Sequence, residues 1–126
     1  METVYLDTHI VLWLFKNELA RFNQKTLELM EESDLYVSPM VKMELKFLQE
    51  IGRTPYSPEE ILANLQRTIG LQVDNASFSD VADHSIAINW TRDPFDRLIC
   101  AHAALYNTIV ITKDKNILEH YEHARW

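Results

Sequence analysis

The chain has 126 residues, of which 47% are hydrophobic and only two are glycines and four prolines, a composition that excludes disordered and fibrous proteins. That length is most simply one domain, residues 1–126, which buries about two-thirds of the surface that its unfolded chain exposes. The net charge of −7 argues against non-specific binding to nucleic acid. It does not exclude a nucleic-acid enzyme, because a divalent cation among converging carboxylates would offset the charge.

The sequence predicts a cytoplasmic protein without membrane association. Met1-Glu2-Thr3 carries no positive region of the kind that opens a signal peptide. The apolar run Ile10–Phe15 is too short to cross a bilayer. The lone Cys100 excludes an internal disulfide framework and suits a reducing compartment.

The first half of the chain predicts strands that alternate with helices. Thr3–Leu6 is a short β-type run, and the apolar block Ile10–Phe15 follows it, so we expect a buried strand leading into a buried helix with Asp7 at the junction. The next expected elements are a helix over 23–32, a strand over 34–37, and a helix from Ser38 to about Ile51 that Gly52 ends.

The second half continues the alternation. Ser57, Pro58 and Glu60 match a capping box that opens a helix, and Gly70 stops that helix. The remaining expected elements are a strand over 71–73, a helix from Ser77 or Ser79 to about Ile88, a helix from Pro94 to about Asn107, a strand over 108–111, a short helix, and an edge strand completed by Trp126. This pattern predicts an α/β fold whose mostly parallel sheet has helices on both faces and its site at the strand ends.

Four carboxylates stand where packing alone would not place them. Asp7 and Asp114 follow predicted strands, and Asp96 projects toward the apolar side of its helix. Glu44 lies near the middle of an apolar helical stripe. Converging carboxylates either share protons or hold a hard cation, and oxygen ligands favour Mg²⁺ or Mn²⁺. Such an arrangement suits metal-assisted hydrolysis of a phosphodiester.

Each acid also has a simpler explanation. Asp7 and Asp114 are plausible helix caps, and Asp93 is one because Pro94 follows it. Asp96 would complement the dipole of its helix from the first turn. Glu44 has no capping explanation and would need a buried cationic partner.

Four segments resemble the four motifs of PIN-domain proteins, and more narrowly of the VapC toxins of bacterial and archaeal toxin–antitoxin modules. They are Tyr5–Trp13, Ser38–Gly52 with its glutamate, Arg92-Asp93-Pro94-Phe95-Asp96-Arg97, and Ile111-Thr112-Lys113-Asp114. The resemblance covers essentially the whole chain. It implies a three-layer α/β/α sandwich and a Mg²⁺- or Mn²⁺-dependent endoribonuclease.

The resemblance also implies roles for particular residues. Asp7 and Asp96 would be the principal metal ligands, and Asp114 would complete the acidic pocket directly or through water. Glu44 would hold a metal-bound water or a second ion. Thr112 matches the small hydroxyl residue beside the pocket.

Other positions near the motifs are less specific to the family. Asp93 belongs to one subset of the family and is either a ligand or only a cap. Met43 departs from the aromatic residue that often precedes the glutamate of the second motif. Arg92, Arg97 and Lys113 flank the third and fourth motifs, and we expect them to contact the RNA backbone.

The family implies an RNA substrate, with transfer RNA as a candidate, a cognate VapB-like antitoxin that blocks the pocket, and a homodimer or a larger assembly. Two apolar stretches are candidate contact surfaces: Ile10–Phe15, and the helical face of Leu62, Leu65 and Ile69. For Trp13, filling the core is the better interpretation.

Two other function classes remain open. A receiver-like or phosphatase domain would use Asp7 as a phospho-acceptor, but it needs a second acid beside that residue, and the sequence has none there. A non-catalytic PIN-like binding module would retain the acids without using them. Only a measurement of activity separates that module from an enzyme.

Overall fold

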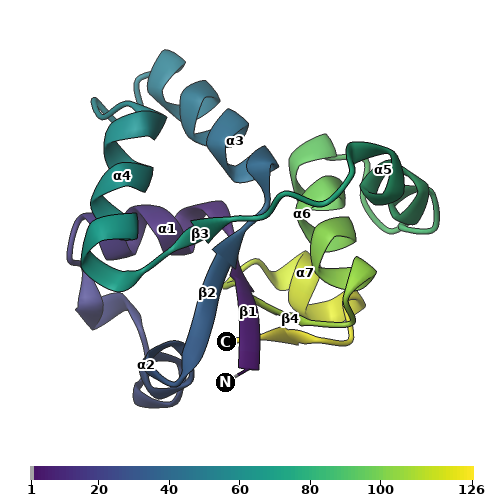
Figure 1. The fold of residues 1–126 in the computed structure, drawn as a ribbon, viewed down its shortest axis with the longest axis horizontal. Helices are drawn as coiled ribbons and strands as arrows, with labels where there is room; N and C mark the ends of the chain where they lie inside the picture. The colour runs from purple at the N-terminus through teal and green to yellow at the C-terminus, as the bar shows by residue number, and fades with distance from the viewer. Residues whose placement is uncertain (1) are drawn as a thin grey trace.

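The computed structural model describes residues 2–126 and contains a five-stranded sheet in the order β3-β2-β1-β4-β5, in which every pair of neighbouring strands is parallel (Figure 1). The predicted α/β fold with a parallel sheet is therefore confirmed. The strands are β1 Glu2–Leu6, β2 Ser33–Val37, β3 Gln72–Val73, β4 Ile109–Ile111 and β5 Ala124–Arg125.

Helices cover both faces of the sheet, which gives three layers (Figure 1). One layer holds α1 Thr8–Phe15, α2 Gln24–Glu31, α3 Pro39–Glu50 and α4 Pro58–Ile69. The other layer holds α5 Phe78–Ile86, α6 Pro94–Leu105 and α7 Lys115–His120. Within the described residues, no helix is both long and apolar enough to cross a membrane.

The central strand β1 supplies side chains to both layers because successive residues of a strand point to opposite faces. Val4 and Leu6 are fully buried in the core beneath α1, α3 and α4. Tyr5 points the other way and packs with Ala103 of α6 and Val110 of β4. This strand is buried on both faces, as parallel sheets require.

Helix ends follow the chemistry that the sequence predicts. The Ser57 hydroxyl accepts a hydrogen bond from the Glu60 backbone N–H at 3.1 Å, which opens α4. Gly70 ends that helix with φ of 72°, and Gly52 follows α3 with φ of 79°. Both glycines therefore occupy the left-handed region that glycine adopts without steric strain.

Some expected details are wrong. The helix α5 ends at Ile86, and Ile88 instead packs into the core from the following loop. Strand β5 ends at Arg125, so Trp126 does not extend it and packs among aromatic side chains. A short 3-10 helix, Leu19–Arg21, was not expected.

The two apolar stretches proposed as contact surfaces are only partly exposed. Leu62 and Leu65 are buried in the core, while Ile69 is 41% exposed. In Ile10–Phe15 the first three residues are buried and the last three are half-buried. Most of both stretches therefore stabilises the fold itself.

The order of the strands determines where the sheet opens. From β1 the chain builds outward through β2 and β3, and then returns to the other side of β1 to add β4 and β5. A crevice forms at such a reversal, outside the carboxyl ends of the two strands that flank it. Here these two strands are β1 and β4. The Asp7 N–H, directly after β1, donates to the carbonyl oxygen of Ile111, the last residue of β4, at 3.0 Å.

Candidate active site

A cavity of about 350 Å³ lies at the carboxyl ends of β1 and β4. It gathers all four carboxylates that the sequence singles out, from four separate segments of the chain. Its lining consists of Asp7, His9, Trp13, Glu44, Asp93, Asp96, Lys113 and Asp114. The fold therefore brings the predicted acidic residues together at one place.

Asp7 is the most deeply placed of these acids, with 6% of its surface exposed. One carboxylate oxygen accepts the Thr8 N–H at 2.8 Å, which caps α1. The other accepts the Thr112 hydroxyl at 2.7 Å. Asp7 is thus both a helix cap and part of the acidic pocket, so the two interpretations of this residue are compatible.

Glu44 reaches the pocket from the middle of α3, flanked on its helix by the buried residues Val41, Leu45 and Leu48. Its Oε1 accepts a hydrogen bond from the Thr8 hydroxyl. No lysine or arginine pairs with it among the described residues. The buried cationic partner that would explain Glu44 by packing is therefore not observed.

Asp93 and Asp96 come from the start of α6. Asp93 caps the helix, because one of its carboxylate oxygens accepts the N–H groups of Phe95 at 2.8 Å and Asp96 at 3.4 Å. Asp96 is half-buried, and within residues 2–126 its carboxylate makes no hydrogen bond or ion pair. It is the acid most free to bind a ligand.

The loop after β4 supplies the fourth acid. Asp114 caps α7 by accepting the Ile117 N–H at 2.9 Å. Thr112 is fully buried, and its hydroxyl accepts the Asp114 N–H at 3.0 Å while it donates to Asp7. This hydroxyl therefore ties the loop to the end of β1.

Burial raises the pKa values of three pocket acids, Asp7, Glu44 and Asp96. Burial, followed by the charges of neighbouring acids, raises the pKa of Glu44 and of Asp96 to about 7. Burial also raises the pKa of Asp7, although the Thr112 and Thr8 hydrogen bonds oppose the rise. The pocket thus resists holding all its negative charges unless a cation enters.

The three cations expected near the RNA are not equivalent. Lys113 lines the pocket, with its Nζ 5.2 Å from the centre of the Trp126 ring. Arg97 is half-buried, and its Nε donates to the Ser85 carbonyl oxygen at 2.9 Å, which joins α6 to the end of α5. Arg92 is exposed and does not line the cavity.

The donor set of the pocket suits a hard divalent cation, since it consists of carboxylate oxygens and Lys113 is the one lysine or arginine among the described lining residues. The side chains do not already surround one point. Among the described residues, no three His, Cys, Asp or Glu side chains are close enough to share an ion. A cation held by three of these acids would require their side chains to rotate toward a common point.

The sequence did not point to two residues that line the cavity, His9 and Trp13, or to Thr8, which binds one of its acids. Thr8 binds Glu44, and its position directly after Asp7 at the start of a helix is the signal that was available. His9 lies inside the first motif, and Trp13, which the sequence places in the core, also reaches the cavity. A spacing of four residues on one helix places both rings on the same face.

Comparison with known proteins agrees with this geometry. The sequence model of the PIN domain matches residues 4–123. The chain belongs to the PIN-domain family. It is also 30% identical to Ribonuclease VapC22 of Mycobacterium tuberculosis, over 99% of this chain and 96% of that protein. The predicted family is confirmed.

Solved structures share the fold of this PIN domain. A toxin–antitoxin complex from Klebsiella pneumoniae matches with a TM-score of 0.66 and 18% identity, over 98% of this chain and 96% of that chain. VapBC2 from Rickettsia felis, bound to a DNA fragment from its promoter, matches with a TM-score of 0.67 and 15% identity, over 93% of this chain and 92% of that chain. DNA-bound VapBC from Salmonella typhimurium matches with a TM-score of 0.63 and 21% identity, over 99% of this chain and 96% of that chain. These similarities confirm the three-layer PIN-like fold.

Proposed function

We propose that this PIN domain is a Mg²⁺- or Mn²⁺-dependent endoribonuclease and the toxin of a toxin–antitoxin module. The observation that carries the proposal is the convergence of Asp7, Glu44, Asp96 and Asp114 on one cavity. The similarity to a protein named as a ribonuclease supports RNA as the substrate. Such an activity belongs in the cytoplasm, where the RNA is.

We propose a different role in hydrolysis for each acid of the pocket. Asp7 and Asp96 would hold the cation, with Asp114 completing the charge around it. When bound, the cation supplies an activated water and stabilises charge on the phosphate oxygens. Glu44, held by Thr8, has a pKa of about 7, which suits a group that accepts a proton at neutral pH.

Lys113 and Thr112 assist from the edge of the pocket. Lys113 provides a positive charge for a backbone phosphate beside an otherwise acidic cavity. Thr112 donates to Asp7 and so favours its ionised form, which is the form that binds a cation.

The test is cleavage of a labelled, structured RNA pool by the purified protein with Mg²⁺, Mn²⁺ or EDTA. We expect cleavage with either metal, none with EDTA, and a loss of at least about a hundredfold in Asp7→Asn and Asp96→Asn. Asn retains the capping oxygen of Asp7, so the first variant still folds. Asp83→Asn, an exposed residue of α5, serves as the matched control and should cleave like wild type.

Cleavage that survives in both pocket variants would indicate a contaminating nuclease. Absence of cleavage under all conditions would favour the non-catalytic binding module. The receiver-like alternative is not favoured, because the sequence has no second acid beside Asp7 and the family match is to the PIN domain. A phosphoaspartate on Asp7 after treatment with a phosphodonor would nevertheless reinstate it.

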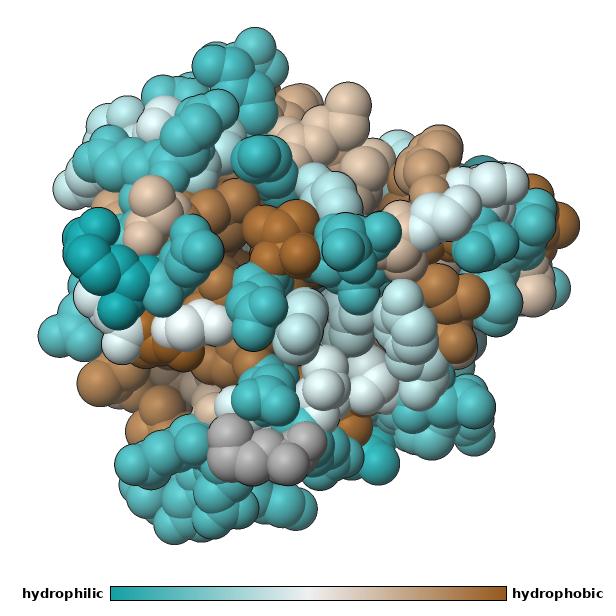
Figure 2. All heavy atoms as spheres, viewed as in Figure 1, coloured by the Kyte–Doolittle hydropathy of each residue, from teal (hydrophilic) through white to brown (hydrophobic). Residues whose placement is uncertain are grey.

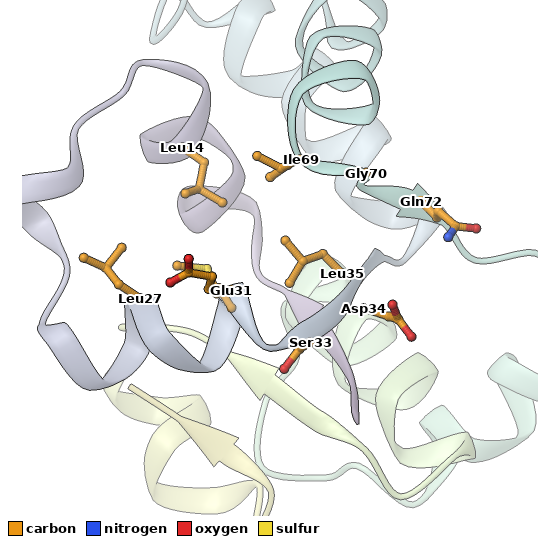
Figure 3. A pocket seen from close by; sticks show the side chains of 10 residues that line it. Leu14, Leu27, Glu31, Ser33, Asp34, Leu35, Ile69, Gly70 and Gln72 are labelled. Atoms are coloured by element: carbon orange, nitrogen blue, oxygen red, sulfur yellow. The ribbon is translucent and has the colours of Figure 1, made fainter. Parts of the chain in front are cut away.

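We also propose a VapB-like antitoxin as the partner, because the structural relatives are toxin–antitoxin complexes. A largely apolar hollow of about 500 Å³ lies where α1, α2, β2 and α4 meet, and Leu14, Leu27, Leu35 and Ile69 contribute to its wall (Figure 3). Hydrophobic residues reach the surface over this region, on the left of Figure 2. Such a surface suits an apolar segment of a partner. A homodimer or a larger assembly remains part of the proposal.

A further inference from the structure

Two aromatic side chains of α1 border the acidic cavity and have no part in the hydrolysis described above. His9 and Trp13 lie one helical turn apart, with ring centres 6.4 Å apart and planes tilted by 54°. His9 is exposed, and within the described chain its side chain makes no hydrogen bond or ion pair. The exposed His9 ring therefore borders the acidic cavity without a polar partner among residues 2–126, and Trp13 lies beside it.

Trp13 is held firmly in this position. Phe22 contacts it edge-on at 6.0 Å between ring centres, and Trp126 does so at 6.1 Å. The Arg21 guanidinium carbon lies 5.2 Å from the centre of the Trp13 ring. A ring supported in this way is a rigid surface, and little conformational entropy is lost when a planar group packs on it.

A positive charge lies beside the same aromatic cluster. Lys113 lines the cavity, and its Nζ sits 5.2 Å from the Trp126 ring centre rather than in an ion pair within residues 2–126. A cation held over a ring keeps its charge available, because the ring is not an anion. The border of the pocket thus combines planar apolar surfaces with a cation.

Planar rings beside a backbone-binding cation are the features with which proteins bind unpaired nucleotides. We propose that the exposed His9 ring, supported by its contact with Trp13, is a stacking platform for one unpaired base next to the phosphate that is cut. In a duplex the base is stacked between its neighbours and cannot enter the platform. This inference rests on the proposed ribonuclease function and specifies its substrate.

The experiment uses one fluorescently labelled oligoribonucleotide, free or annealed to its complement, with the wild type, His9→Ala and His9→Phe. We expect the wild type to cut the free strand and to leave the duplex largely intact. His9→Ala should raise KM roughly five- to tenfold with kcat little changed, and His9→Phe should restore KM to within about twofold. His84→Ala, an exposed histidine of α5, is the matched control.

Oligoribonucleotides that lack the base at one position identify which nucleotide stacks on His9. Removing the base at one position should raise KM for wild type but add nothing to the effect of His9→Ala, because both changes remove the same contact. Additive effects at every position would overturn the platform. So would equal cleavage of duplex and free strand, or a His9→Phe variant as weak as His9→Ala, since the latter would mean that the ring nitrogens are what matters.

Binding separates failure of this inference from failure of the proposed function. Quenching of tryptophan emission by the unlabelled free strand measures affinity without cleavage. If the strand binds in a His9-dependent way but is never cut, the platform stands and the ribonuclease proposal fails. If the wild type cuts the strand with no effect of His9, only the platform fails. If the strand neither binds nor is cut, both fail.

Discussion

Thr112 carries no charge, yet its hydroxyl connects two acids of the pocket. It donates to the Asp7 carboxylate at 2.7 Å and accepts the Asp114 N–H at 3.0 Å. Burial raises the pKa of Asp7, and this hydrogen bond is the largest effect that opposes the rise. The hydroxyl therefore favours the ionised form of a deeply buried carboxylate.

We predict that Thr112→Val moves the midpoint of the pH–activity profile to higher pH, because the ionised form of Asp7 loses a donor and its pKa rises further. The variant should also lose about 1–3 kcal/mol of unfolding free energy. Thr112→Ser, which keeps the hydroxyl, should retain the wild-type pH–activity midpoint and the wild-type free energy of unfolding. The measurements are cleavage rate against pH and urea unfolding. Thr68→Val, which removes an exposed hydroxyl of α4, should leave the pH profile unchanged.

At the scale of elements, three pocket carboxylates double as helix caps. Asp7 caps α1, Asp93 caps α6, and Asp114 caps α7. An N-cap side chain lies at a helix start, and in this fold the helix starts follow the carboxyl ends of strands or the loop that faces them. Local capping chemistry and the position of the site therefore have one cause.

The capping role of Asp93 gives a separate prediction. Asp93→Asn should keep the cap and the stability, and it should lower the pKa of Asp96 because one neighbouring negative charge is lost. Asp93→Ala should have the same effect on the pKa of Asp96 and should also lower the free energy of unfolding by about 1 kcal/mol, because the cap is lost. Unfolding free energies and the pH dependence of cleavage test this. Ser57→Ala, a cap far from the pocket, should cost similar stability without changing the pH profile. Loss of cleavage in a stable Asp93→Asn protein would instead make Asp93 a ligand.

At the scale of the whole molecule, the pocket acids make stability depend on pH. Glu44 and Asp96 have pKa values of about 7 in the folded protein, above their ordinary values of 4.5 and 3.8. Between about pH 4 and pH 7 the folded state therefore binds protons that the unfolded chain has released. Folding stability falls as pH rises through this window.

We predict that the Tm of the metal-free protein decreases from pH 5 to pH 8, with a change in unfolding free energy of about 1–2 kcal/mol after allowance for solvent screening. Added Mg²⁺ should raise the Tm at pH 8 much more than at pH 5, because the ionised acids bind the cation. Thermal unfolding with and without EDTA measures both effects. The double variant Glu44→Gln and Asp96→Asn should show a smaller dependence of Tm on pH in this range, and little response to Mg²⁺.

The sequence alone was sufficient to predict the features that depend on local chemistry and on the periodicity of apolar residues. Turn glycines such as Gly70, the Ser57 cap and the strand ends that carry Asp7 and Asp114 all follow from short patterns. The acids were recognised because Glu44 and Asp96 contradict the apolar faces around them. A charge that violates its own periodic pattern is informative even in a single sequence.

Other features depend on which segments meet in space, and no local pattern encodes that. The hydrogen bond of Arg97 to Ser85 results from the packing of α6 on α5, so sequence proximity to a motif was a poor guide to its environment. The position of Trp126 depends on Trp13 and Phe22, which lie about a hundred residues away. Long-range packing of this kind overrides the β-type pattern at the chain's last residues.

The capping aspartates also affect how such a gene can lose its activity. One nucleotide change converts an aspartate codon to an asparagine codon, and asparagine caps a helix as well as aspartate does. At Asp7 such a change would remove a carboxylate that we propose as a metal ligand, while the helix start is preserved. Under the proposed function, cells that escape the toxin by mutation should therefore often carry full amounts of a folded, inactive protein that still binds the antitoxin and competes for it with active copies.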